Sequence, residues 1–397
     1  MLSQSISLYK KLQKRYSRRI NLDLSRINKV LKRLNQPHLN LVNPINILGS
    51  DGKMSVLTSL KYFLEGNKKN VTAFTSPHLY DLRQRFWLKN KYISTKEIKK
   101  QIKIIESTRL NLTLFELLTC VHILAAKNLN KVSYNLIESG LLFKRDSTNL
   151  WRSPKAQIVT NINFQHQEWV TPKTIEEICK QKVGNLSKNT VIYIAPQKFR
   201  VLKIIKKLLK NNSSKIIYPT SWRIENKKNI LFYKDNKNKI PIKTNFIKSR
   251  ALISNLGLAI KVALDFGVKK SMILKTIPKI KFEGRIQYIK KGKLKKLLYK
   301  NEKLLVDGCH SMSSGTNLYS YLKTLKGPIY GIWGMQKNKM PDKFIKLFNN
   351  IFKKIFTIKI PNEPNACNAG ELKKINKKFN NNTEVALNIK NAIKKIS

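Results

Sequence analysis

The stretch that decides the fold reads Ile47-Leu48-Gly49-Ser50-Asp51-Gly52-Lys53-Met54-Ser55. The apolar residues at its start predict a buried strand, the two glycines a tight loop, and the residues from Ser55 onward an amphipathic helix. In such a loop backbone N–H groups turn toward bound phosphates, the helix N-terminus adds positive potential, and Lys53 can reach the terminal phosphates. The stretch therefore predicts nucleotide binding by Gly49 to Ser55, with the Ser55 hydroxyl near magnesium and the Asp51 carboxylate in need of neutralisation.

Length and composition indicate a globular protein of two domains. The chain has 397 residues, and hydrophobic residues make up 42% of it, which is enough for two buried cores. No apolar run approaches the ~18–20 residues that a membrane helix needs, so we expect no membrane span. The four cysteines form no CxxC pair, which argues against a disulfide framework or a zinc ribbon and favours a reducing compartment.

The net charge of +57, from 79 Lys and Arg against 22 Asp and Glu, allows two interpretations. A basic surface can bind nucleic acid by releasing counterions from its phosphates. However, Lys far exceeds Arg and is spread along the whole chain beside many Asn and Ile, without the aromatic and arginine clusters typical of nucleic-acid readers. The pattern favours compositional drift, and we expect no specific nucleic-acid partner.

The first 22 residues also allow two interpretations. They are rich in Ser, Lys and Arg and contain no acidic residue, a composition typical of organellar transit peptides. The apolar residues Leu8, Leu12, Tyr16 and Ile20 recur at helical spacing, which predicts an ordinary first helix. The helix is the favoured interpretation.

Short β-branched runs alternate with longer helical patterns, which predicts an α/β fold. We expect an N-terminal domain with the phosphate loop and a mostly parallel sheet over residues 1–282, and a smaller Rossmann-like α/β domain over residues 283–397. The predicted strands are residues 45–48, 71–75, 132–137, 157–162, 190–195, 215–218, 304–306, 329–333 and 355–358, with helices over 55–64, 115–126 and 254–266 and a solvated hairpin over 225–243.

Several further motifs occur along the chain in a fixed order. They are Thr75-Ser76-Pro77-His78-Leu79, Thr113-Leu114-Phe115-Glu116, Glu138-Ser139-Gly140-Leu141, His166 with Lys182-x-Gly184, Gly284-Arg285-Ile286-Gln287 and Asp307-Gly308-Cys309-His310. Together with the phosphate loop, this series resembles the folylpolyglutamate synthase and dihydrofolate synthase family of the Mur ligase superfamily. The resemblance covers nearly the whole chain.

The resemblance implies an ATP- and magnesium-dependent ligase that joins L-glutamate to dihydropteroate, to reduced folates, or to both. In that reaction ATP phosphorylates a carboxylate to an acyl phosphate, which the amine of glutamate then attacks. Two anions must approach each other, which requires a metal ion and cationic side chains.

The resemblance also implies residue roles. Lys53, Lys182 and His166 would be catalytic, and Lys182 would be carbamylated. Magnesium would be held by Ser55, Ser76, Glu138 and His166. Nucleotide contacts would include Asn255, Arg285, Asp307 and His310 in addition to the phosphate loop, and substrate contacts Phe115, Glu116, Arg145 and Asp146.

Departures from the family pattern affect the same regions. Leu142-Phe143 replaces a Gly-Gly pair, which predicts a poorer approach of substrate to that loop. Gln165 replaces the Asp before His166, which predicts the loss of an orienting carboxylate. Met54 stands where Gly is usual, and Ser311-Met312 where Asn-Pro is expected.

Two rival interpretations stay open. A peptidoglycan Mur ligase would share the phosphate loop but should lack the motifs that begin at Thr75 and Thr113. A catalytically inert, basic binding protein on the same scaffold would explain the lost acidic and glycine positions. We expect a cytoplasmic monomer.

If the charge reflects drift, binding to nucleic acid should be weak and independent of sequence. The affinity for nucleic acid should fall steeply between about 50 and 200 mM salt, because counterion release supplies the whole free energy of such binding. Fluorescence anisotropy with unrelated duplex and single-stranded probes checks this. A complex with one sequence that survives physiological salt would contradict the drift interpretation.

Overall fold

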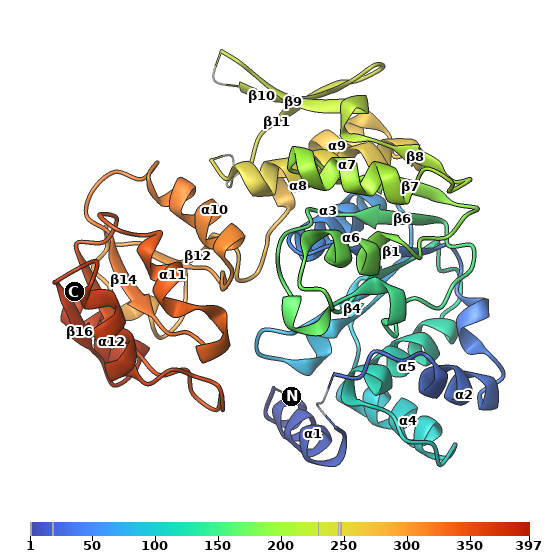
Figure 1. The fold of residues 1–397 in the computed structure, drawn as a ribbon, viewed down its shortest axis with the longest axis horizontal. Coiled ribbons are helices and arrows are strands. Elements are labelled where there is room, and N and C mark those ends of the chain that lie inside the picture. The colour runs from blue at the N-terminus through green and yellow to red at the C-terminus, as the bar shows by residue number, and fades with distance from the viewer. Residues whose placement is uncertain (1, 18–19, 229, 245, 247) are drawn as a thin grey trace. The chain divides into compact units, whose positions relative to one another are not determined.

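The computed structural model describes residues 2–17, 20–228, 230–244, 246 and 248–397 (Figure 1). Contacts divide the chain into two units, residues 1–247 with 252–280 and residues 248–251 with 281–397. The chain passes from the first unit into the second for the last time after residue 280, beside the boundary expected at residue 282. The short stretch 248–251 groups with the second unit, which the sequence pattern does not predict.

The first unit is built on an eight-stranded sheet in the order β4-β3-β2-β5-β1-β6-β7-β8. Strands β2, β5, β1, β6, β7 and β8 run parallel, and β3 and β4 add an antiparallel edge. The mostly parallel α/β prediction is therefore confirmed. The strands are β1 (Pro44–Leu48), β2 (Val71–Phe74), β3 (Phe86–Leu88), β4 (Lys91–Tyr92), β5 (Tyr134–Glu138), β6 (Ala156–Val159), β7 (Val191–Ile194) and β8 (Lys215–Ile217).

The strand order reverses at β1. This strand pairs with β5 on one side and β6 on the other, while the next strand in the chain, β2, lies beyond β5. Every residue of β1 is buried, as expected for a central parallel strand. In open parallel sheets ligands bind outside the carboxyl ends of the strands at such a reversal, and the residue that follows β1 is Gly49.

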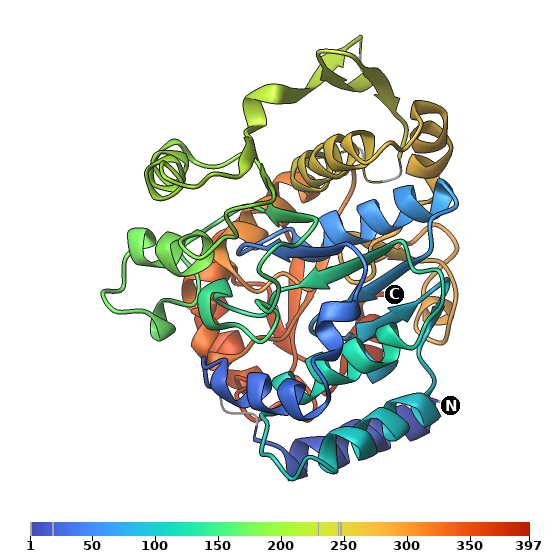
Figure 2. The same ribbon diagram turned by 90° about the vertical axis from the view of Figure 1, so that its right-hand side faces the viewer.

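Helices of the first unit are α1 (Leu2–Arg15), α2 (Ser25–Arg33), α3 (Lys53–Gly66), α4 (Thr95–Glu106), α5 (Leu114–Lys127), α6 (Ile175–Val183), α7 (Phe199–Leu208), α8 (Arg250–Asp265) and α9 (Lys270–Thr276). Helix α3 packs against α9, and α4 packs against α5 (Figures 1 and 2). The expected hairpin is a three-stranded antiparallel sheet of β9 (Trp222–Lys227), β10 (Ile230–Asp235) and β11 (Lys239–Ile242).

The predicted first helix exists as α1, which buries Leu8 and Leu12 against the first unit. The hydroxyl of Ser5 donates a hydrogen bond of 2.5 Å to Asp81, which follows β2. The helix ends at Arg15, so Ile20 lies outside it, and residues 1, 18 and 19 of the expected segment are not among those described.

The second unit pairs β14 (Tyr330–Trp333), β15 (Lys354–Thr357) and β16 (Thr383–Val385) in parallel, and β12 (Gln287–Ile289) with β13 (Leu304–Val306) antiparallel. Its helices are α10 (Met312–Leu322), α11 (Pro341–Lys346), α12 (Ala369–Lys377) and α13 (Ile389–Ile396). The smaller α/β domain is thus present, and its core includes Phe344, Phe348 and Leu372.

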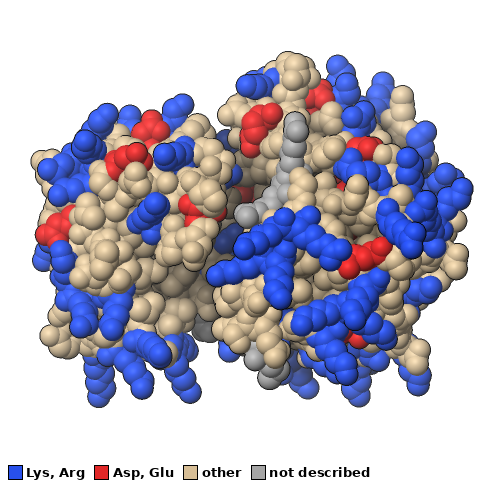
Figure 3. Space-filling model, turned by 90° about the horizontal axis from the view of Figure 1, so that it is seen from below, with Lys and Arg blue, Asp and Glu red and all other residues tan. Residues whose placement is uncertain are grey.

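Lysine and arginine side chains occur across the whole visible face in Figure 3, with few acidic side chains among them. None of the helices in the described part of the chain is long and apolar enough to cross a membrane. All four cysteines are described, and all are free thiols.

One polar side chain of helix α5 lies in the core. His122 is 1% exposed, and neither of its ring nitrogens has a hydrogen-bond partner among the residues that the structure describes. Its ring stacks on Phe74 at 5.4 Å between centroids. Burial lowers the pKa of His122 from 6.5 to about 3, because the apolar surroundings penalise the charged imidazolium.

This burial makes stability depend on pH. Below about pH 6.5 His122 is protonated in the unfolded chain and stays neutral in the folded chain. The free energy of unfolding should therefore fall by up to about 1.4 kcal/mol per pH unit as pH drops toward 3. His122→Leu should raise the free energy of unfolding by about 1–3 kcal/mol at neutral pH, because it removes the unpaired nitrogens. Urea unfolding of the variant and the wild type at pH 8 and pH 5 measures the pH dependence and the effect of the substitution. If the difference in free energy of unfolding between the two proteins is no larger at pH 5 than at pH 8, the predicted pH dependence is wrong.

Candidate active site

The phosphate loop begins at the carboxyl end of β1 and depends on its two glycines. Gly49 has φ +138°, and a Cβ added there would lie 2.2 Å from the Thr160 hydroxyl oxygen. Gly52 has φ +91°, and a Cβ there would lie 2.7 Å from the Asn255 side-chain oxygen. Both positions therefore need glycine for conformation and for space.

Two lysine side chains meet at the carbonyl oxygen of Gly49. Lys53 Nζ donates to it at 3.1 Å and also to the carbonyl of Ser50 at 3.2 Å. Lys182 Nζ reaches the same Gly49 oxygen at 3.2 Å from helix α6, and it also donates to the carbonyl of Leu141. The loop thus brings together the two lysines that the family resemblance assigns to catalysis.

Lys182 is unusual among the lysines of this chain because it is 1% exposed. Burial and, next, the neighbouring Lys53 ammonium lower the pKa of Lys182 from 10.5 to about 7. A large fraction of this side chain is therefore the neutral amine near pH 7, the form that can act as a nucleophile.

Ser55 and Asn255 meet at the start of α3. Asn255 on α8 donates from its side-chain nitrogen to the Ser55 hydroxyl oxygen at 2.8 Å, and that hydroxyl donates to the Gly52 carbonyl at 2.9 Å. The two residues lie 200 positions apart in the chain, and the fold brings them together. Their contact with nucleotide stays a prediction.

The Asp51 carboxylate accepts hydrogen bonds from two side-chain amides. Asn163 donates to it at 2.7 Å, and Gln165 donates to both of its oxygens at 3.1 Å. The expectation that Gln165 marks a lost orienting carboxylate therefore needs revision, because the carboxylate of this contact stands on Asp51. An aspartate in place of Gln165 would face Asp51 and repel it.

The expected metal ligands come from the ends of neighbouring strands. The backbone N–H of Ser76, after β2, donates to the Glu138 carboxylate at the end of β5 at 3.0 Å. His166 follows β6 in the left-handed region at φ 61° and starts a short 3₁₀ turn, η4 (Gln167–Trp169). Its Nδ1 lies 4.0 Å from the Glu168 carboxylate.

This donor set can be tested against magnesium chemistry. In the described residues no three His, Cys, Asp or Glu side chains gather into a metal cluster. The expected set has one carboxylate, one imidazole and two hydroxyls, which suits an ion that keeps several waters and takes phosphate oxygens, as magnesium does. The residues therefore fit magnesium bound together with a nucleotide.

The loop after β5 is organised by a buried carboxylate. Asp146 accepts hydrogen bonds from the backbone N–H groups of Gly140 at 3.1 Å and Leu141 at 3.2 Å, and burial raises the pKa of Asp146. Leu142 and Phe143 are each 1% exposed and belong to the core beneath this loop. Their side chains are therefore part of the core, and the poorer approach of substrate expected from the lost glycines stays a prediction.

The other expected substrate residues differ in their surroundings. Phe115 lies beside Gly140, whose added Cβ would come within 3.0 Å of its ring. Glu116 caps α5 and pairs with Arg26 at 2.8 Å, so its contacts give it a structural role. Arg145 is exposed. All three assignments to substrate stay predictions.

The expected residues of the second unit form a local group. The Asp307 carboxylate accepts from the backbone N–H groups of Ile286 and Cys309, each at 2.8 Å. Arg285 donates to the Gly284 carbonyl at 2.8 Å, and His310 Nδ1 lies 3.0 Å from the Gly308 carbonyl oxygen. Ser311, where Asn is expected, caps α10.

Sequence reasoning missed several contacts around the site. Asn163 exchanges hydrogen bonds with the Ser50 hydroxyl, and its side chain holds Asp51. Buried Arg85 donates to His78 at 3.0 Å. The signal for Asn163 was the amide-rich run Asn161-x-Asn163-x-Gln165 at the end of the strand predicted over residues 157–162.

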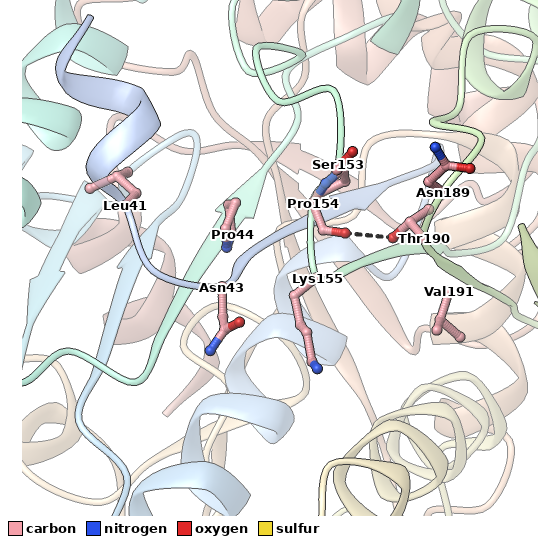
Figure 4. Close-up of a pocket in the computed structure, with 9 residues that line it drawn as sticks. All are labelled: Leu41, Asn43, Pro44, Ser153, Pro154, Lys155, Asn189, Thr190 and Val191. Carbon is pink, nitrogen blue, oxygen red and sulfur yellow. Dashed lines mark hydrogen bonds between the residues drawn. The ribbon is translucent and has the colours of Figure 1, made fainter.

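A separate cavity of about 610 Å³ lies at the amino ends of β1, β6 and β7, at the opposite ends of the strands from the phosphate loop (Figure 4). Thr190 donates to the Pro154 carbonyl at 2.6 Å within its wall. The lining carries one charged side chain, Lys155, and no convergent set of polar groups among its described residues, so it is not the candidate site.

The chain resembles known enzymes in sequence. A dihydrofolate synthetase of Saccharomyces cerevisiae is 27% identical over 322 residues, which cover 77% of this chain and 73% of that protein. A dihydrofolate synthase/folylpolyglutamate synthase of Bacillus subtilis is 26% identical over 191 residues, 46% of this chain and 44% of that protein. No protein-family model matches. The resemblance drawn from the motifs is confirmed.

Solved structures agree on the fold. Mycobacterium tuberculosis folylpolyglutamate synthase complexed with ADP superposes with a TM-score of 0.83 at 17% identity, covering 99% of this chain and 90% of that one. A bifunctional folylpolyglutamate synthase/dihydrofolate synthase with Mn, AMPPNP and L-glutamate bound gives 0.81 at 17% identity, covering 99% and 91%. These likenesses show a common fold.

Proposed function

We propose that this chain is an ATP-dependent amide ligase that joins L-glutamate to dihydropteroate or to a reduced folate. The observation that carries the proposal is the meeting of Lys53 and Lys182 at the Gly49 carbonyl, on a phosphate loop at the carboxyl end of β1. The names of the sequence relatives supply the reaction, and a fold neighbour binds a nucleotide analogue, Mn and L-glutamate.

The residues support a division of roles. Lys53 stands at the N-terminus of α3, where an ammonium and the backbone N–H groups of the loop together stabilise phosphate charge. Asn255 fixes the Ser55 hydroxyl from α8. When bound, magnesium would supply charge neutralisation between the nucleotide phosphates and the carboxylate substrate, with Ser55, Ser76, Glu138 and His166 as its protein ligands.

The rival functions differ in what supports them. The sequence relatives carry folate-enzyme names, which disfavours a peptidoglycan ligase. An inert binding protein would have no reason to keep Lys182 buried with a depressed pKa beside Lys53, because burying an ammonium opposes folding. An active ligase is therefore the better account.

The remaining expectations belong to the same proposal. Residues 1–282 would act as the ATP-binding domain and residues 283–397 as the C-terminal domain of the ligase, contributing Arg285, Asp307 and His310. We further propose that the enzyme works as a cytoplasmic monomer on small-molecule substrates, without a specific nucleic-acid partner.

The proposal predicts that Lys53→Ala abolishes most ligation. A preorganised cation at the transferred phosphoryl group is typically worth on the order of 10²–10³ in turnover, whereas a half-buried loop side chain adds little to the core. Purified protein is incubated with ATP, L-glutamate and either dihydropteroate or tetrahydrofolate, and the product is identified by mass.

Lys100→Ala, an exposed lysine on α4, is the matched control and should keep wild-type turnover and melting temperature. Wild-type turnover in Lys53→Ala would show that the loop is not a phosphate cradle. Absence of any product from the wild type with either acceptor would refute the ligase itself.

We also propose that Lys182 is carbamylated. The neutral amine adds CO₂ and loses a proton, so the reaction should increase as pH rises through about 7, the pKa of this side chain. With ¹³C-bicarbonate, the wild type should show a slowly exchanging carbamate carbon signal that Lys182→Arg lacks. Acetate should partly restore ligation to Lys182→Ala.

The carbon signal can be read without activity, so a folding defect in one variant does not obscure the result. A fully active wild-type preparation that shows no carbamate signal in bicarbonate would contradict the modification. Full activity of Lys182→Ala without acetate would remove this lysine from the reaction.

A further inference from the structure

The segment after β6 is attached to the phosphate loop along its length. Thr160 N–H donates to the Leu48 carbonyl at 2.7 Å, and the backbone N–H groups of Ser50 and Asp51 donate to the Asn161 carbonyl at 2.9 and 3.1 Å. These bonds continue the pairing of β1 with β6 beyond the strand ends. Backbone hydrogen bonds therefore join the two segments as far as residue 161.

Beyond residue 161 side chains replace backbone pairing. The Ser50 hydroxyl accepts from Asn163 N–H at 3.0 Å. The Asp51 carboxylate then accepts from the Asn163 side chain at 2.7 Å and from the Gln165 side chain at 3.1 Å. Gln165 immediately precedes His166, so Asp51 holds the residue next to the imidazole in the chain.

The backbone at His166 has a conformation that is uncommon for a residue with a Cβ. Its φ of 61° is left-handed, so this conformation costs free energy that neighbouring contacts have to offset. The turn η4 fixes the chain on the far side, where Trp169 N–H donates to the His166 carbonyl at 3.1 Å. On the near side the contact between Gln165 and Asp51 performs the same task.

We propose that Asp51 is a positioning residue: by accepting hydrogen bonds from Asn163 and Gln165, it fixes residues 163–166 and thereby the place of the His166 imidazole. A carboxylate suits this position because it accepts from both amides at once without offering a competing donor. The inference rests on the proposed function only for the role of His166 as a metal ligand. The geometry itself holds without it.

Reversal of the pair gives a test that conserves the number and shape of the atoms. Asp51→Leu keeps the shape of the side chain but cannot accept from either amide, and Gln165→Glu sets a carboxylate against Asp51, so each of these single variants loses the contact. In the double variant Asp51→Asn/Gln165→Glu, the new amide oxygen at position 51 accepts from Asn163. The new amide nitrogen there donates to the carboxylate introduced at position 165, which restores both bonds. Glu97→Gln on α4, where Glu97 accepts from Gln101, is the matched control.

The first measurement is hydrogen exchange of the ligand-free protein. Both single variants should exchange faster than wild type over residues 161–169, the double variant should return to the wild-type rate, and peptides from α4 should not change. The second is calorimetric binding of Mn²⁺ in the presence of ADP. Both single variants should weaken it on the order of tenfold, as loss of an orienting partner does, and the double variant should return to within about threefold of wild type.

The magnesium concentration that gives half-maximal ligation should shift in the same way, while Glu97→Gln should change nothing. A double variant as impaired as Gln165→Glu alone would overturn the proposal. So would wild-type exchange in Asp51→Leu together with lost Mn²⁺ binding, because Asp51 would then contact the ligand itself. If the wild type makes no product, the proposed function fails, and exchange and Mn²⁺ binding still decide the role of Asp51.

Discussion

The carbonyl oxygen of Gly49 accepts hydrogen bonds from two lysine side chains, and the rest of the site is arranged around this contact. Burial of Lys182 and, next, repulsion by the Lys53 ammonium lower the pKa of Lys182 to about 7, so this side chain is driven toward its neutral form. The fold stabilises this arrangement with the central strand β1, the glycine conformations and the segment after β6.

The strands of the first unit could be predicted from the sequence because buried parallel strands read as short β-branched runs. The short antiparallel strands β3 and β4 were missed, since three and two residues leave no periodicity to detect. The third strand of the β9–β11 sheet was missed for a similar reason, because Lys and Asn surround it. Local sequence pattern thus found the core and failed at its edges.

The residues of the site were found by the motif series, and their interactions were not. Nothing in the sequence distinguishes Lys182 from the other lysines except its motif, because burial is a property of the tertiary fold. The relation between Asp51 and Gln165 spans 114 positions, and only the pairing of β1 with β6 brings them together. Read singly, each looked like a defect. The burial of Leu142 and Phe143 was likewise not predicted, because it too is a property of the tertiary fold.

The hydrogen bond from Asn255 to Ser55 sets an order for assembly during synthesis. The strand, loop and helix that contain residues 44–66 leave the ribosome early, but the side chain that restrains Ser55 is made 200 residues later. Because domains fold as units as the chain emerges, the phosphate loop stays incomplete until α8 has been translated and packed. A nascent chain that ends before α8 therefore exposes a nearly finished sheet with an unfinished loop. In such a chain the Ser55 hydroxyl lacks the restraint that Asn255 supplies, so the loop is completed only when almost the whole first unit exists.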